Sequence, residues 1–295
     1  MIPAAFEYAV PRSLEDAVAV LAGCEAGTAA ILAGGMSLLP TMKLRLAAPA
    51  LLVDIGRLRE LAGISRASGR LRIGALTTHA ELLAAPELAD WPVFAETAGV
   101  LGDPQVRNRG TFGGSLAQAH PAADWPAVFL ALCGVACVRS SRGERSVRSE
   151  DFFTGVLTTA IAEGEILTHI TFPAGARRSG AAYSKMRQQA SGMALAGVAA
   201  RITLDAAGRI EESTVGVTGI GGAPFRARSI EQRLSGLLPT PSILEESCAD
   251  VPEADPTNDL HADADYRRQL LRVHATRALT RALTRALERA RSTIP

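Results

Sequence analysis

The sequence predicts a two-domain chain of the α+β or α/β class, and three observations support this. The chain has 295 residues and is 47% hydrophobic, which exceeds the usual size of a single core. Short apolar runs typical of strands alternate with runs that have helical spacing. The polar stretch Gly-Ala-Arg-Arg-Ser-Gly at 175–180 has the composition of a linker.

In the first part of the chain, strands are expected at 29–35, 50–56 and 70–76, where apolar residues cluster or alternate. A helix is expected between the first two strands. Ser37 is placed as its N-cap and Pro40 falls in its first turn, where the missing N–H costs little. Thr78 is placed as the N-cap of a second helix.

Further along, two strands are expected within 136–147, another at 165–173, and a long hairpin turning at 205–208. A helix should end at Gly236. Residues 264–290 read as one long amphipathic helix, in which arginine recurs every four residues. We expect its basic face to be solvated or packed against the other domain.

Composition excludes several classes of function. The chain carries 31 basic and 30 acidic residues, so its charge of +1 gives no electrostatic case for nucleic acid or an anionic membrane. Its longest apolar run, 126–138, is shorter than the roughly 18 residues of a membrane span. The first residues show no basic segment leading into an apolar one, so we expect a cytoplasmic protein without a secretory signal.

The four cysteines are scattered and lack the spacing of metal ligands. We therefore expect no metal site in this chain and interpret them as free thiols. They are Cys24, Cys133, Cys137 and Cys248. The same absence of cysteine runs means that this chain does not itself hold iron–sulfur clusters.

The stretch Ala-Gly-Gly-Met-Ser, between an expected strand and an expected helix, offers consecutive backbone N–H groups to a pyrophosphate. It is not the Rossmann fingerprint, because no third glycine opens the helix, and no Gly-Lys-Ser/Thr follows as in a Walker loop. Taken alone, Gly34-Gly35 is more readily interpreted as a tight turn than as a binding site.

A second diglycine turn, Gly-Thr-Phe-Gly-Gly-Ser at 110–115, changes this assessment, since two such turns could converge on one extended phosphate-bearing ligand. A β-carbon at Gly34 or Gly114 would then fill the space of the pyrophosphate. Asp124 is placed to accept hydrogen bonds from sugar hydroxyls. It could instead cap the helix that begins beside it, and both roles are compatible.

Four stretches together resemble the FAD-binding medium subunit of the molybdenum hydroxylases, the xanthine dehydrogenase and carbon monoxide dehydrogenase family. They lie at 31–55, 71–82, 102–128 and 183–200, and the colinear likeness spans essentially the whole chain. The resemblance implies an α+β fold: a two-lobed FAD-binding domain of the vanillyl-alcohol-oxidase (PCMH) type, then a smaller α+β domain. The expected boundaries are 1–175, with lobes at about 1–56 and 57–175, and 176–295.

The same resemblance implies a set of FAD contacts. The first turn would bind the pyrophosphate through its backbone, and the second would form another phosphate-side loop. Asp124 would contact the ribityl or ribose part, Val100 and Leu101 would line the cofactor, and Leu167, Tyr183 and Lys185 would lie near the flavin ring. The turn residues implied are Ala33, Gly34, Gly35, Met36 and Ser37, then Thr111, Gly113, Gly114 and Ser115.

Two departures from the family pattern concern this site. Met36 stands where relatives commonly have histidine, which leaves the backbone donors intact, so FAD binding should survive. The stretch after Lys185, Gln-Gln-Ala-Ser-Gly-Met, lacks the acidic residue that many relatives show, which affects contacts at the flavin edge. His79 is interpreted as a residue at a helix start and not as a covalent flavin attachment.

The implied function is electron transfer with no catalytic side chain in this chain. Two-iron two-sulfur clusters on a small subunit and a molybdenum cofactor on a large subunit would pass electrons to this FAD, and then to an external acceptor. A dimer of heterotrimers is expected. The alternatives are a free-standing FAD-dependent oxidase of the vanillyl-alcohol-oxidase type and a nucleotide-binding scaffold without turnover.

Overall fold

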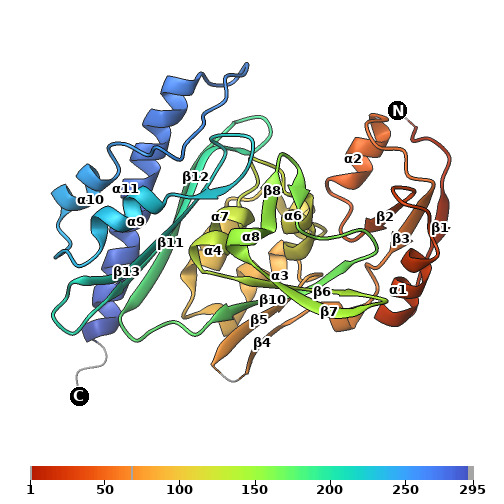
Figure 1. Cartoon of the computed structure of the whole chain (residues 1–295), viewed down its shortest axis with the longest axis horizontal. Coiled ribbons are helices and arrows are strands. Elements are labelled where there is room, and N and C mark those ends of the chain that lie inside the picture. The colour runs from red at the N-terminus through yellow and green to blue at the C-terminus, as the bar shows by residue number, and fades with distance from the viewer. Residues whose placement is uncertain (1, 68, 292–295) are drawn as a thin grey trace.

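Three units lie in a row in Figure 1, with the N-terminal residues at one end and the long C-terminal helix at the other. The structure is a computed structural model that describes residues 2–67 and 69–291. The central unit contacts both outer units. The two boundaries between units are therefore the places to look for a ligand site.

The N-terminal unit is a three-stranded parallel sheet with strand order β1-β3-β2. Its core includes Val18, Leu21 and Val53. The strand that ends in the first glycine turn, β2, is shorter than expected because the turn starts at Ala33. The elements are β1 (Glu7–Ala9), α1 (Leu14–Ala22), β2 (Ala29–Leu32), α2 (Leu38–Lys43) and β3 (Leu51–Asp54).

The central unit is a five-stranded antiparallel sheet, order β4-β5-β10-β6-β7, with helices packed on one face. A two-stranded hairpin and four short helical turns of three or four residues complete it. The strands are β4 (Ile64–Ala67), β5 (Arg70–Gly74), β6 (Val135–Ser140), β7 (Gly143–Arg148), β8 (Phe153–Gly155), β9 (Thr158–Thr159) and β10 (Ile166–Pro173). The helices are η1 (Arg59–Leu61), α3 (His79–Ala84), η2 (Pro86–Leu88), α4 (Pro92–Gly99), α5 (Pro104–Arg107), α6 (Phe112–Gln118), α7 (Trp125–Ala131) and α8 (Ser149–Phe152).

Aromatic residues fill the core between this sheet and its helices. Phe94, Phe112, Trp125 and Phe172 are fully buried and meet edge to face or tilted, with ring centroids 5.0 to 6.3 Å apart. Because α6 and α7 each contribute one of these rings, the core fixes the two helices that flank the second glycine turn and Asp124.

The C-terminal unit is a four-stranded antiparallel sheet, order β11-β12-β13-β14, with one face covered by the 28-residue helix α11. The helix comes very close at Gly180, where a β-carbon would lie 2.2 Å from the Ala282 carbonyl oxygen. The elements are β11 (Ser179–Arg187), β12 (Ala194–Leu204), β13 (Ile210–Thr218), β14 (Phe225–Arg226), α9 (Arg228–Leu234), α10 (Pro241–Ser247) and α11 (Ala264–Arg291).

The local signals account for most of these elements. Thr78 caps α3 in a capping box with Glu81, as its N-cap position predicts. The hairpin of β12 and β13 turns at 205–209, and Gly236, at φ 74°, follows the end of α9. Ser37 lies at the N-cap position of α2, as predicted, but its side chain does not cap the helix. Ser37 precedes α2 with φ −110° and ψ −50°, not in the extended form that turns a cap oxygen toward the helix, and makes no cap bond.

Candidate cofactor site

The first glycine turn, Ala33–Ser37, presents a row of backbone donors. The N–H groups of Gly34, Gly35, Met36 and Ser37 have no acceptor within residues 2–67 and 69–291, whereas the carbonyls of Gly35 and Ser37 accept from Leu39 and Thr41. Gly35 adopts φ +77°, which only glycine takes readily. Successive free N–H groups form a concave anion site, so this turn has the chemistry to hold a pyrophosphate.

The second glycine turn, 110–115, is different because its backbone donors are already used. Every N–H from Phe112 to Ser115 has an acceptor within the protein, and Thr111 caps α6. This turn can therefore reach a ligand through its side chains but not through these amides. The acceptors are Thr77 O for Phe112 at 2.9 Å, Ala75 O for Gly113 at 2.9 Å, Thr111 Oγ1 for Gly114 at 3.1 Å and Thr111 O for Ser115 at 3.1 Å.

The two turns pack directly on each other, which confirms that they converge. A β-carbon on Gly34 would lie 1.9 Å from the Arg109 carbonyl oxygen and 3.1 Å from the Gly110 Cα atom. A β-carbon on Gly114 would lie 3.9 Å from that of Ala33 and 2.6 Å from Thr111 Oγ1. The expectation that such atoms would fill the pyrophosphate's space is therefore wrong, because both point at protein. These glycines allow the turns to close together.

A buried polar trio lies at the other end of α6. The Asp124 carboxylate is 1% exposed, and both of its oxygens lie 2.9 Å from Lys185 Nζ. Tyr183 donates its hydroxyl to the same carboxylate, and Lys185 also donates to the Gly192 carbonyl at 2.8 Å. Residues 183 and 185 are two positions apart in β11, so their side chains project from the same face of the sheet and can both bind Asp124.

Burial shapes the electrostatics of this trio. It raises the pKa of Asp124 above its ordinary value, and the nearby Lys185 ammonium and the two hydrogen bonds oppose that rise. Burial, together with the Asp124 charge, raises the pKa of Tyr183 well above 10. The prediction that Asp124 caps α7 is wrong: the residue occupies the N-cap position, but its side chain makes no cap bond.

The first glycine turn and the trio are joined by α6. This helix has seven residues and therefore spans about 10 Å. Its N-terminal end touches the first glycine turn, and its C-terminal end leads through 119–123 to Asp124. The phosphate-type donors and the buried trio are thus linked through one short helix.

Three apolar residues that the resemblance assigns to the cofactor lie in different settings. Val100, at the end of α4, is 40% exposed and available for contact. Leu101 is partly buried against the central core. Leu167, in β10 opposite Val138, is 6% exposed and belongs to the same core as Tyr183. These contacts remain predictions.

A cavity of about 260 Å³ was not foreseen from the sequence. It is lined by Ser191 and Met193, on either side of the Gly192 whose carbonyl binds Lys185. Its walls come from four segments that are distant in the chain: the loop before Asp124, the turn between β11 and β12 with the start of β12, the loop after β13, and the segment leading into α11. The side chains that give it polar character are His120, Gln188, Asp259, His261 and Arg267. No motif connects these segments, so only the fold could show the cavity.

His79 is the first residue of α3, as expected, and its side chain is buried. It is 5% exposed, and its Nδ1 accepts a hydrogen bond from Trp125 Nε1 at 3.1 Å. Burial, with a smaller effect of the Arg107 charge, lowers its pKa to about 4. The imidazole is therefore neutral near pH 7. Its role is to pack in the core and to accept the hydrogen bond from Trp125.

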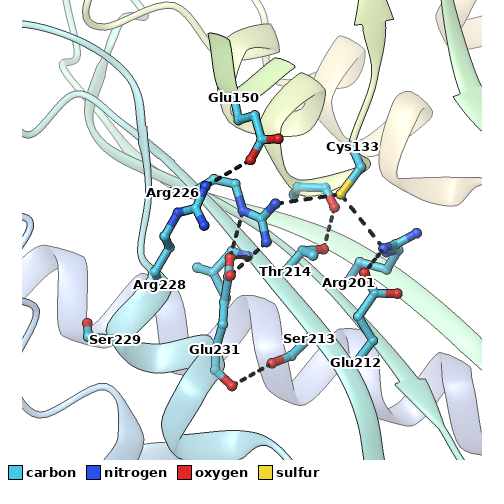
Figure 2. Close-up of polar contacts among 12 residues, drawn as sticks. Cys133, Glu150, Arg201, Glu212, Ser213, Thr214, Arg226, Arg228, Ser229 and Glu231 are labelled. Atoms are coloured by element: carbon cyan, nitrogen blue, oxygen red, sulfur yellow. Dashed lines mark hydrogen bonds and ion pairs between the residues drawn. The ribbon is translucent and has the colours of Figure 1, made fainter. Parts of the chain in front are cut away.

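All four cysteines are free, as expected. Cys133 is half-buried, with its Sγ 3.8 Å from both Arg201 and Arg226, as Figure 2 shows. Burial raises the pKa of this thiol, against the influence of the two guanidinium groups. Glu212 forms an ion pair with Arg201, and Glu231 forms one with Arg226, so the positive charges near the sulfur are balanced. The cluster connects the central unit to the C-terminal sheet.

The α+β fold and the site define a class of protein that binds an extended nucleotide cofactor between small mixed units. Residues 4–175 match the family model described as the FAD binding domain in molybdopterin dehydrogenase. Residues 181–282 match the CO dehydrogenase flavoprotein C-terminal domain. The chain therefore belongs to the flavoprotein family of the molybdopterin dehydrogenases, and the predicted fold class, with its PCMH-type FAD domain, is confirmed.

Individual relatives cover nearly the full length. The carbon monoxide dehydrogenase medium chain of Hydrogenophaga pseudoflava is 37% identical over 95% of this chain and 97% of its own. The nicotine 6-hydroxylase medium subunit of Paenarthrobacter nicotinovorans is 35% identical over 91% and 94%. A solved carbon monoxide dehydrogenase from Hydrogenophaga pseudoflava matches with a TM-score of 0.92 at 36% identity, covering 97% of this chain and 99% of that one.

Within residues 2–67 and 69–291, no helix is long and apolar enough to cross a membrane. The same residues contain no group of three or more His, Cys, Asp or Glu side chains that could hold a metal ion.

Replacing Lys185 with methionine should destabilise the chain by about 3 to 5 kcal/mol, because the Asp124 charge would be left buried without its partner. Removing both charges in Asp124→Asn/Lys185→Met should cost less than the sum of the two single changes. Urea denaturation of the four proteins measures this coupling. Strict additivity would show that the pair does not interact as the geometry requires.

Acidification should destabilise the chain through His79. Its folded pKa of about 4 lies below the unfolded value near 6.5, so the unfolded state binds the proton first and stability falls as the pH drops from about 6.5 to 4. His79→Gln should reduce this loss by up to about 3 kcal/mol. Denaturation curves across that pH range provide the test. A change at the exposed His261, His261→Gln, should leave the loss in place.

Proposed function

We propose that this chain is the FAD-carrying medium subunit of a molybdenum hydroxylase. In that role it takes electrons from two-iron two-sulfur clusters on a small subunit and passes them to an external acceptor. The observation that carries the proposal is the row of N–H groups at Gly34–Ser37, which have no acceptor within the described part of the chain and whose turn packs against the second glycine turn. The names of the relatives, which are medium subunits of dehydrogenases and hydroxylases, support it.

The chain's own residues would act by binding and orientation. The N–H groups of the first glycine turn would neutralise the pyrophosphate by donating hydrogen bonds. Thr111 and Ser115 would contribute hydroxyl groups from the second turn, while its amides keep α6 in place. FAD, once bound, supplies the redox chemistry by accepting electrons and passing them on.

At the other end of α6, the trio would meet the sugar-alcohol chain and the polar edge of the flavin. Asp124 and the Gly192 carbonyl hold the Lys185 ammonium group in place. Because the Asp124 carboxylate neutralises that charge, the pair would act by fixing the shape of the site and not by adding a net charge beside the flavin. No side chain needs to act as a general acid or base.

The remaining expectations about organisation are part of the same proposal. The FAD-binding domain would comprise residues 1–175, with lobes at about 1–56 and 57–175, and the second domain residues 176–295. A large subunit would carry the molybdenum cofactor, and two heterotrimers would associate. Four free thiols agree with a cytoplasmic location.

Gly34→Ala should weaken FAD binding at least about tenfold, because the new methyl group would push the first turn away from Arg109 and misalign its donors. Flavin content after purification and FAD titration of the flavin-free chain measure the effect. Met36→Ala is the matched control, since it changes an exposed side chain and keeps the backbone N–H. Full flavin content in Gly34→Ala would place the cofactor elsewhere.

Co-purification separates the subunit from the oxidase alternative. Expressed with its neighbouring reading frames, the tagged chain should bring down stoichiometric iron–sulfur and molybdenum subunits, together with one FAD per chain. A flavin-containing chain that purifies alone from those cells and oxidises an organic substrate by itself would contradict the proposal in favour of a free-standing oxidase.

A further inference from the structure

Three arginines on one side of α11 bind three carbonyl groups of the neighbouring strand. Arg281 donates to the Tyr183 carbonyl, Arg285 to the Ala181 carbonyl at 2.6 Å, and Arg289 to the Ser179 carbonyl at 2.9 Å. We call Arg281, Arg285 and Arg289 the arginine ladder. The four-residue repeat in the sequence is therefore more than amphipathic patterning, since each repeat matches one acceptor.

The match follows from the geometry of the two elements. Four residues of a helix rise about 6 Å, and two residues of a strand advance about 6.6 Å. Because β11 pairs only with β12, the carbonyls of every second residue point away from the sheet without a strand to receive them. The glycine at position 180 lets α11 come close enough for the arginines to reach them.

The rung nearest the cofactor site is fixed from two sides. Glu96, on α4 of the central unit, accepts the Tyr183 N–H at 3.1 Å. The same carboxylate forms ion pairs with Arg281, at 3.3 Å, and with Arg285. Both outward backbone groups of Tyr183 are thus held by charged side chains, one from each of the two units.

Tyr183 is also the residue whose hydroxyl binds Asp124, and Lys185 follows two positions later on the same face. A shift of the Tyr183 backbone would therefore move both donors of the buried trio at once. Glu96 and Arg285 are partly shielded, with 22% and 23% of their side chains exposed, so their attraction is less screened than that of a surface pair.

We propose that Arg281, Arg285 and Glu96 are positioning residues for the FAD site, which hold the Tyr183 backbone so that Tyr183 and Lys185 meet Asp124. This inference rests on the proposed function, because it takes the trio as part of the cofactor site. It predicts that the ladder is graded: the rung at Tyr183 controls flavin binding, and the rung at Ser179, about 13 Å further along the strand, contributes to stability alone.

The test compares Arg281→Met with Arg289→Met in the full chain. Each change removes one arginine that binds a carbonyl of the same strand. Arg281→Met should raise the FAD dissociation constant about tenfold and shift the flavin absorbance maxima and midpoint potential. Arg289→Met should keep the wild-type values. Arg281→Lys, which can still donate to the Tyr183 carbonyl, should restore part of the affinity.

Stability and hydrogen-exchange measurements distinguish a specific loss of FAD binding from a loss caused by misfolding. Circular dichroism and melting temperature report the fold of each variant, and hydrogen exchange at the Tyr183 amide should rise in Arg281→Met and in Glu96→Gln. Wild-type FAD affinity in a folded Arg281→Met would overturn the inference. Equal loss of affinity in Arg289→Met would overturn it as well, because it would show a general effect of α11.

Two reference variants distinguish this failure from failure of the proposed function. If Gly34→Ala and Lys185→Met both bind FAD as the wild type does, the cofactor site itself is misplaced. If both lose FAD while Arg281→Met retains it, the site stands and only the positioning role is rejected.

Discussion

The buried ion pair between Asp124 and Lys185 is the constraint on which the arrangement of this chain depends. One partner stands at the start of α7 in the central unit and the other on the first strand of the C-terminal sheet, and both side chains are at most 3% exposed. Two charges leave water only where geometry and further hydrogen bonds repay the cost. Tyr183 and the Gly192 carbonyl supply those bonds. The pair therefore favours one relative position of the central unit and the C-terminal sheet.

The two glycine turns differ in what their backbones offer. Within the described residues, the N–H groups of Gly34 to Ser37 have no acceptor, and α2, which follows them, has only six residues. In the second turn, the N–H groups from Phe112 to Ser115 bind Ala75, Thr77 and the Thr111 cap, which holds that turn in place. The first turn packs against the second through Gly34, so its open donors are supported by a neighbour whose own amides are largely occupied.

The order of strands and helices, the long hairpin and the cap at Thr78 could be predicted from the sequence, because each is signalled by residues close together in the chain. The meeting of the two turns brings distant residues together, and it was expected because both turns carry a diglycine pair beside a hydroxyl residue. The roles of Ser37 and Asp124 could not be predicted. A residue at an N-cap position caps only if its backbone angles and competing partners allow it, and Asp124 has a lysine 61 residues away. The cavity beside His120 also depends on segments that only the fold brings together.

The arginines along α11 also decide how this chain can meet others. The outward carbonyls of Ser179, Ala181 and Tyr183 already accept guanidinium groups, so a strand from another molecule could pair with this stretch of β11 only by displacing the arginines. The hazard of edge-to-edge aggregation is therefore lower along 179–183. A protein that approaches this part of the edge must be recognised through side chains, which makes the contact specific in sequence.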